Sequence, residues 1–231
     1  MIYGNNQLMK SNTQLGPSPV FEGYTGWTVQ SGNPTSISLA YPTGTSENDI
    51  LIIVIMTYLY DTLSSLPSGW TELSKKGSSW YEQIIWKRAD GTESGNLILD
   101  LINDSSYPTA GAYMLRISGC TLTGSPFDTN TVGNTVSSRS SQSLTHTGTE
   151  GNNRLGIAIY SLWDDVSSPT FNNGTWTRNY FLASTAGNDT THIVYSQQIT
   201  TAGSTGGAVG YSFYSEDVCC GIIFILKPLN S

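Results

Sequence analysis

The chain has only two histidines, His146 and His192, and they are the first residues to test for catalytic chemistry. In serine hydrolases a His takes the proton of a nucleophilic Ser, which in many of them sits in a Gly-x-Ser-x-Gly turn. No such turn occurs in the sequence. His146 falls at the edge of a loop, and His192 precedes Ile193 in an apolar run. We expect both to be structural or exposed rather than catalytic.

Carboxylates offer a second route to chemistry, because glycoside hydrolysis uses two of them about 5 to 10 Å apart. The doublets Asp164-Asp165 and Glu216-Asp217 are the obvious candidates. Neighbours in an extended segment point to opposite faces, so neither doublet can flank one bond. Asp61 and Asp164 each follow an apolar run, where acidic residues commonly hydrogen bond a turn. The sequence therefore predicts no catalytic residues and a protein that is not an enzyme.

Metal-binding patterns are also missing from the sequence. Zinc motifs such as His-Glu-x-x-His or Cys-x-x-Cys are absent, and adjacent Cys219 and Cys220 would face opposite sides of a strand. Asp128, Asn130 and Asn188-Asp189 carry oxygen ligands for calcium but lack an Asp-x-Asp-x-Asp-Gly pattern. No Gly-rich loop is followed by Lys-Ser or Lys-Thr to hold a nucleotide. We expect no metal and no cofactor, and three buried free cysteines.

The amino-acid composition limits the classes of partner that we expect for this chain. The 231 residues include 12% charged residues and carry a net charge of -7, whereas Ser and Thr together make up about a quarter of the chain. Nucleic-acid binding depends largely on neutralising phosphates, so we expect no nucleic-acid partner. The longest uncharged apolar stretch, Ile50–Tyr60, is far shorter than the roughly 20 residues that span a bilayer. With no signal-peptide pattern at the N-terminus, we expect a soluble protein made in a reducing cytoplasm, with no membrane contact.

An internal repeat is the strongest organisational signal. Five landmarks occur twice, at offsets that rise from 104 residues for the first to 110 for the last: Thr-Gly-Thr, an Asn, a long apolar run, a turn ending in Trp-Thr and a closing apolar strand. The first set is Thr43–Thr45, Asn48, Ile50–Met56, Trp70-Thr71 and Gly111–Ser118; the second is Thr147–Thr149, Asn152, Leu155–Tyr160, Trp176-Thr177 and Gly221–Leu226. This order predicts a duplication with halves of about residues 21–125 and 126–231.

The elements that must position these residues are predicted to be strands. Short apolar runs separated by Gly, Asn, Asp and Ser turns, without a helical stripe, indicate an all-β sandwich or barrel. Two tandem sandwiches and one larger sandwich both fit two repeats. Because the junction 118–127 is short and apolar, we favour one jelly-roll-like double-sheet sandwich over residues 21–231, in which each half contributes strands to both sheets.

Residues 1–20 fit neither repeat and are predicted to form an N-terminal arm. The segment is polar but includes apolar side chains that could order on a partner. These candidate docking residues are Ile2, Tyr3, Leu8, Met9 and Leu15.

Trp70 and Trp176 occupy matching positions after a tight turn. Exposed, they could form a platform for a sugar. Their repetition at a fold landmark favours paired core residues that close each end of the sandwich.

Five segments of the first half follow one another in a recognisable order: Glu47–Val54, Leu66–Leu73, Trp86–Ala89, Tyr113–Cys120 and Ser125–Asp128. In this succession the chain resembles virion proteins of tailed bacteriophages. The likeness covers Val29 to Asp128 and departs from the usual pattern at Ile50 and Cys120. Members of such families are capsid decoration, head-fibre or tail-associated proteins, and the pattern carries no catalytic residues.

The resemblance implies a structural virion protein, assembled in the host cytoplasm. The first hypothesis is a capsid decoration protein on the outer head surface, with the major capsid protein or other virion proteins as partners and a homo-oligomer as its form. The alternative is a tail or fibre module that binds host-surface glycans through loop Tyr and Trp residues.

Overall fold

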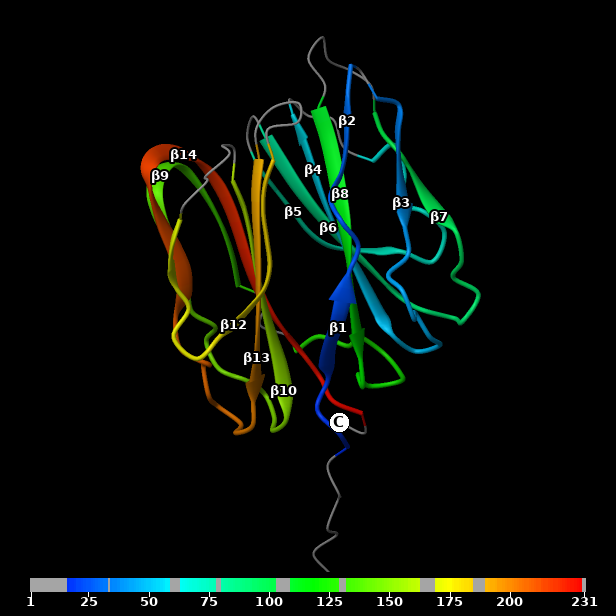
Figure 1. Ribbon diagram of the computed structural model, residues 1–231. Helices are drawn as coiled ribbons and strands as arrows, with labels where there is room; N and C mark the ends of the chain where they lie inside the picture. The colour runs from blue at the N-terminus through cyan, green and yellow to red at the C-terminus, as the bar shows by residue number, and fades with distance from the viewer. Residues whose placement is uncertain are drawn as a thin grey trace, which may run out of the picture.

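The longest apolar runs of the chain form the central strands of two β-sheets (Figure 1). β-Branched and aromatic side chains favour this outcome because they pack well on a pleated, half-buried surface. The computed structural model describes residues 16–32, 34–58, 63–77, 80–102, 109–128, 132–162, 169–184 and 190–229. Within these ranges the structure has strands and turns, and no helix is long and apolar enough to cross a bilayer.

The strands of the described ranges, in chain order, are β1 (Val20–Tyr24), β2 (Thr28–Ser31), β3 (Ser36–Ala40), β4 (Ile50–Tyr58), β5 (Thr71–Gly77), β6 (Trp80–Arg88), β7 (Asn96–Asp100), β8 (Thr109–Ser118), β9 (Val132–Leu144), β10 (Arg154–Leu162), β11 (Thr170–Asn172), β12 (Thr177–Ser184), β13 (Thr190–Ile199) and β14 (Val209–Leu226). The first large sheet has the order β1-β8-β4-β6-β5, with β2 also on β8. The second has the order β11-β14-β10-β13-β12, with β9 also on β14. β3 and β7 form a small third sheet. The all-β sandwich class predicted from the sequence is therefore confirmed.

The two large sheets have the same strand order, which supports the internal repeat. β8, β4, β6 and β5 of the first sheet correspond to β14, β10, β13 and β12 of the second. The β3–β7 pair corresponds to the pairing of Ser141–Leu144 in β9 with Val209–Ser212 in β14. In the second half these segments are continuous with the large sheet, which is why β14 reaches 18 residues.

Backbone conformation marks the same repeat. Among the non-glycine residues described, Asn48 and Asn153 have positive φ, 71° and 55°. Each lies two residues before the apolar run of a central strand, β4 or β10. Asn tolerates this left-handed conformation better than most residues. The structural counterpart of Asn48 is thus Asn153, one residue after the Asn152 that the sequence landmarks suggested.

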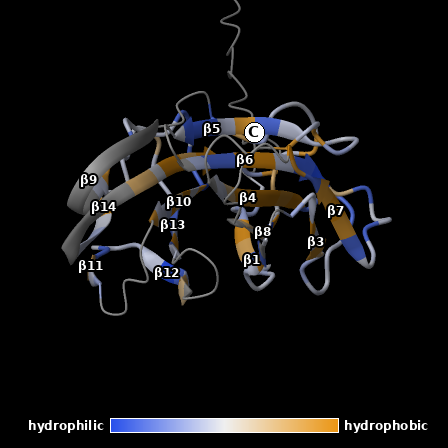
Figure 2. Cartoon of the chain, turned by 90° about the horizontal axis from the view of Figure 1, so that it is seen from above, coloured by the Kyte–Doolittle hydropathy of each residue, from blue (hydrophilic) through white to orange (hydrophobic). Residues whose placement is uncertain are grey.

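Three apolar clusters hold the layers together. One fills the space between the two large sheets, and each sheet buries its other face against its own outer layer: β3 and β7 in the first half, the start of β14 and the end of β9 in the second. Side chains alternate along β4, because successive residues of a strand point to opposite faces. Ile50, Ile52 and Val54 face the inter-sheet cluster, and Leu51, Ile53 and Ile55 face the outer one. From above, β4 is hydrophobic along its length, whereas β5 at the sheet edge is largely hydrophilic (Figure 2).

One expectation about the halves is wrong. We expected each half to contribute strands to both sheets, but each large sheet is built from one half alone, and the two halves lie side by side (Figure 1). Strands that are near neighbours in sequence pair with one another more readily than with distant ones. The result is two sandwich-like halves that share a third, central core.

The junction between the halves is fastened to the end of the chain. Cys120 and Phe127 form β-bridges with Pro228 and Leu226. The backbone N–H of Asp128 donates to the carbonyl of Ile225 at 3.0 Å. The first half is therefore tied to the last strand of the second half by backbone hydrogen bonds as well as by the shared core.

Gly111 in β8 provides a test of packing between β2 and β8. A Cβ at this position would overlap the ring of Trp27, whereas a Cβ at Gly26 would meet nothing within 4 Å. We expect Gly111→Ala to lower the free energy of unfolding by about 1–3 kcal/mol because the indole must move. Gly26→Ala is the matched control. Urea denaturation of both variants checks this, and equal midpoints would show that Trp27 does not pack as described.

Candidate functional site

Several residues singled out from the sequence lie outside the described residues. These are the arm residues Ile2, Tyr3, Leu8, Met9 and Leu15, the acidic residues Asp61, Asp164 and Asp165, the calcium candidates Asn130, Asn188 and Asp189, and the side chains of Glu216 and Asp217. The last residues of the predicted arm are described. Pro19 is buried, and its carbonyl accepts a hydrogen bond from Gln198 Nε2 at 2.6 Å, so residues 16–20 lie against the body of the protein.

The two repeated tryptophans are core residues. Trp70 and Trp176 are 6% and 2% exposed and belong to the outer clusters of the first and second halves. Trp176 Nε1 donates to the carbonyl of Gly206 at 3.0 Å. Their predicted role as core residues is confirmed, and neither ring is available to stack on a sugar.

Both histidines are fully buried, in different settings. The backbone N–H of Gly148 donates to His146 Nδ1 at 3.1 Å, so this imidazole supports a turn. His192 in β13 lies in the space between the sheets beside Ser161 of β10, and Ser161 in turn hydrogen bonds Glu82 of β6. These three residues could not be grouped from the sequence, since Glu82 and His192 are far apart in the chain.

Glu82, Ser161 and His192 form a hydrogen-bonded row across the two halves. Ser161 Oγ lies 3.3 Å from His192 Nδ1, and its hydroxyl also hydrogen bonds the Glu82 carboxyl group. The three residues are 1%, 0% and 0% exposed. A catalytic triad needs the acid on the imidazole and an open approach to the Ser. Here the acid contacts the Ser and all three groups are enclosed, so this set lacks the geometry of acyl transfer.

Aromatic rings surround the row. The rings of Trp27 and Tyr113 lie with their centroids 4.1 and 5.3 Å from that of His192. Burial lowers the pKa of His192 to about 3 and raises the pKa of Glu82 to about 7, against a smaller opposing effect of the Ser161 hydrogen bond and Lys76. Eight buried side-chain polar atoms of the described residues have no hydrogen-bond partner, and four of them belong to this row and its aromatic neighbours: Trp27 Nε1, Glu82 Oε2, Tyr113 OH and His192 Nε2. These unpartnered groups make the centre of the inter-sheet core costly to ionise.

The alternation of side chains along a strand is the sequence signal that could have pointed to Glu82 and His192. Glu82 shares its face of β6 with Ile84, and His192 shares its face of β13 with Val194; both apolar residues belong to the inter-sheet cluster. Alternation could place each polar residue on a buried face. It could not show that the two faces meet.

Glu82→Gln should change how stability depends on pH. The pKa of Glu82 is about 7 in the folded protein, against an ordinary value of 4.5. Its contribution to the free energy of unfolding is therefore fully present below pH 4.5 and is lost as the pH rises through 7. We expect the variant to match the wild type near pH 4 and to exceed its free energy of unfolding by about 2–3 kcal/mol at pH 8. Urea denaturation at both pH values measures this, with exposed Glu47→Gln as control; a constant difference would contradict the buried, proton-holding carboxyl.

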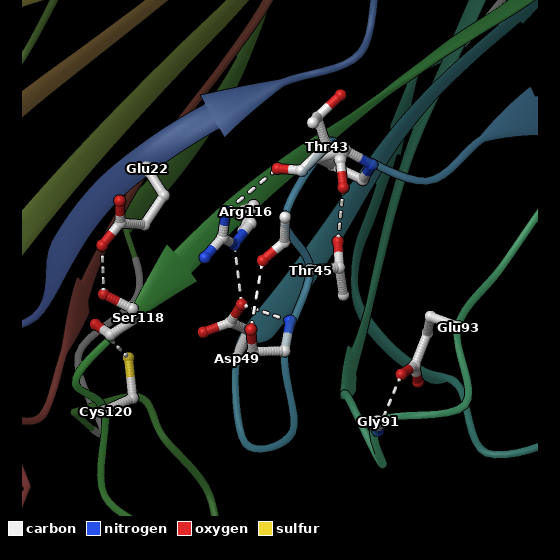
Figure 3. A network of polar contacts seen from close by, with 12 residues as sticks. Glu22, Thr43, Thr45, Asp49, Gly91, Glu93, Arg116, Ser118 and Cys120 are labelled. Carbon is white, nitrogen blue, oxygen red and sulfur yellow. Dashed lines mark hydrogen bonds and ion pairs between the residues drawn. The ribbon is translucent and has the colours of Figure 1, made fainter.

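Two ion pairs lie where the apolar runs of the central strands begin. Arg116 Nε lies 2.7 Å from Asp49 Oδ2, its Nη1 donates to the carbonyl of Thr43 at 3.0 Å, and Asp49 Oδ2 also accepts the N–H of Ser46 (Figure 3). In the second half the residue before the apolar run is Arg154, the first residue of β10, whose Nε lies 3.1 Å from Asp128 Oδ1. Asp128, considered above as a calcium ligand, is thus engaged by an arginine.

A groove opens between β1 and the β12–β13 edge, where the two halves meet. It has a volume of about 510 Å³ and includes no charged residue in its lining. Val20, Phe21 and Leu155 supply its apolar wall. Uncharged hydrogen-bonding side chains supply the remainder: Thr175, Thr177, Asn179, Ser196, Gln197 and Gln198. This groove is the one surface feature described here with the size and mixed lining of a small-ligand site.

Comparison with known proteins adds no family to this picture: no family model, no curated protein and no solved structure matches the chain.

Proposed function

We propose that this chain is a structural protein of a tailed-phage virion and decorates the outer surface of the head. Several of the residues that carry the resemblance to virion proteins stabilise the fold. Asp49 and Arg116 pair with each other, and Trp70 fills the outer core of the first half. A pattern of this kind supports a role that depends on shape.

The observation that carries the proposal is the set of contacts that Phe127 and Asp128 make at the junction between the halves. The Phe127 ring packs edge-on against Trp86 of the first half and Phe224 of the second, with centroids 5.3 and 5.5 Å apart. Asp128 next to it pairs with Arg154. These contacts join the two sandwich-like halves into one compact unit. A unit of this kind suits the surface of a particle that must resist mechanical and chemical stress.

The proposed partners are the major capsid protein or other virion proteins, and the chain itself as a homo-oligomer. The test is co-sedimentation of the purified protein with assembled heads of the virus that encodes it and with dissociated shell subunits. We expect binding to assembled heads alone. Equal binding to free subunits, or none to heads, would contradict a decoration role.

The arm can be tested in the same assay. Deleting residues 1–15 removes Ile2, Tyr3, Leu8, Met9 and Leu15 but leaves β1 and the Pro19–Gln198 contact in place. Loss of head binding with an unchanged melting temperature would support the arm as the docking segment. Undiminished binding would assign docking to the sandwich.

The second candidate, a tail or fibre module that binds host glycans, is favoured by the uncharged groove. Trp70 and Trp176 are buried and cannot contact a glycan, so binding would depend on the groove residues. A cell-adsorption assay with the purified protein separates the two roles, since a head decoration protein need not attach to cells.

A further inference from the structure

The polar side chains of the groove beside β1 are all uncharged hydrogen-bonding groups. Three of these side chains, Asn179, Gln197 and Gln198, are amides, and the other three carry hydroxyl groups. Amides and hydroxyls both donate and accept hydrogen bonds, as a sugar hydroxyl does. With no charge in the lining, a charged ligand would lose its hydration without an ionic partner.

Internal hydrogen bonds hold these amides in place. Asn179 and Ser196 bond to each other at 3.0 Å across β12 and β13, and Gln197 Nε2 donates to Thr175 Oγ1 at 2.5 Å. Gln198 is fixed by its bond to the Pro19 carbonyl. An amide has two donor and two acceptor positions, so each retains capacity for a ligand. Side chains already fixed lose little entropy on binding.

The apolar part of the groove faces the same space. Phe21 and Leu155 come from the two different halves and pack against the inter-sheet core. A pyranose ring has an apolar face of C–H groups between its hydroxyls. A groove that combines an apolar wall with uncharged hydrogen-bonding side chains therefore fits the two-sided character of a sugar ring.

An exposed aromatic side chain lies nearby. Tyr24, at the end of β1, is 43% exposed and its ring centroid lies 4.4 Å from that of Tyr180, the residue after Asn179. Stacking on Tyr180 fixes the Tyr24 ring, while its exposed part remains available. A second sugar unit leaving the groove along β1 could pack against it.

We propose that this groove binds a neutral oligosaccharide, with Asn179 and Gln198 hydrogen bonding its hydroxyls and Tyr24 stacking on a neighbouring unit. The inference goes beyond the structural role and does not depend on where the protein sits in a virion.

Isothermal titration of the purified full chain tests the proposal, with maltohexaose, cellohexaose and chitohexaose as probes. We expect at least one to bind with a Kd of about 0.1–10 mM, the range of weak single-groove ligands. Asn179→Ala and Gln198→Ala should each weaken it by about tenfold or more, as expected for the loss of one or two hydrogen bonds. Tyr24→Ala should weaken the hexasaccharide more than the matching disaccharide.

Two further variants keep the outcome interpretable. Thr177→Trp places a large ring in the groove from an exposed position and leaves the hydrogen bonds of Asn179, Gln197 and Gln198 in place. It should abolish binding, and it serves as the test even if Asn179→Ala unfolds. Asn96→Ala on β7, an exposed amide outside the groove, is the matched control and should bind like the wild type. No binding of any of the three probes, or binding that survives both Asn179→Ala and Thr177→Trp, would overturn the site. Either result would leave head binding of the same variants unaffected.

Discussion

Replacing Arg154 with Ala is expected to lower the free energy of unfolding by about 3–5 kcal/mol, because it leaves the Asp128 carboxylate buried without its charge partner. The two side chains are 8% and 0% exposed, and Arg154 Nε lies 3.1 Å from Asp128 Oδ1. The pair also holds the junction between the halves, where Asp128 accepts the backbone N–H of Glu150. Guanidinium chloride denaturation followed by fluorescence measures the loss.

The control for this prediction is Glu47→Ala, which removes an exposed charge and should change stability by less than about 0.5 kcal/mol. The double variant Arg154→Met/Asp128→Leu should recover much of the stability lost in Arg154→Ala, since a buried ion pair replaced by apolar groups of similar volume is often neutral. An Arg154→Ala variant as stable as the wild type would show that the pair does not fasten the junction to the second half.

Replacing Trp176 with Ala should have an effect of similar size, about 3–5 kcal/mol, because it opens a large cavity in the outer core of the second half. The indole is 2% exposed and lies over Gly156 of β10, where a Cβ would come within 2.7 Å of the ring. It also donates from Nε1 to Gly206. Both packing and a hydrogen bond are lost in the Ala variant.

Trp176→Phe separates these two contributions. It keeps most of the ring volume and loses the N–H donor, so it should cost less than Trp176→Ala. Leu122→Ala, at a side chain 50% exposed, is the control and should lie within about 0.5 kcal/mol of the wild type. Thermal melts of the three variants test the order. Equal loss in the Phe and Ala variants would mean that packing contributes little.

The fold class and the repeat could be predicted because both are written in local patterns. The apolar runs around Ile52 and Ile157 become central strands, and the Trp-Thr turns become the starts of β5 and β12. Strand propensity and turn chemistry act over a few residues, so a single sequence carries them.

The assignment of strands to sheets and the ion-pair partners could not be predicted in this way. Asp49 and Arg154 each lie directly before the apolar run of a central strand but carry opposite charges. Their partners come from different places, Arg116 on β8 and Asp128 at the junction. Likewise the meeting of Glu82 and His192 depends on how two sheets pack, and no local pattern records that packing.

The most direct test of the proposed function is an electron cryo-microscopy reconstruction of intact particles of the virus that encodes this chain. The proposal predicts density for the two-lobed sandwich at regular positions on the outer surface of the head, in fixed ratio to the major capsid protein. Particles without this density on the head, or with it confined to the tail, would contradict a head decoration protein.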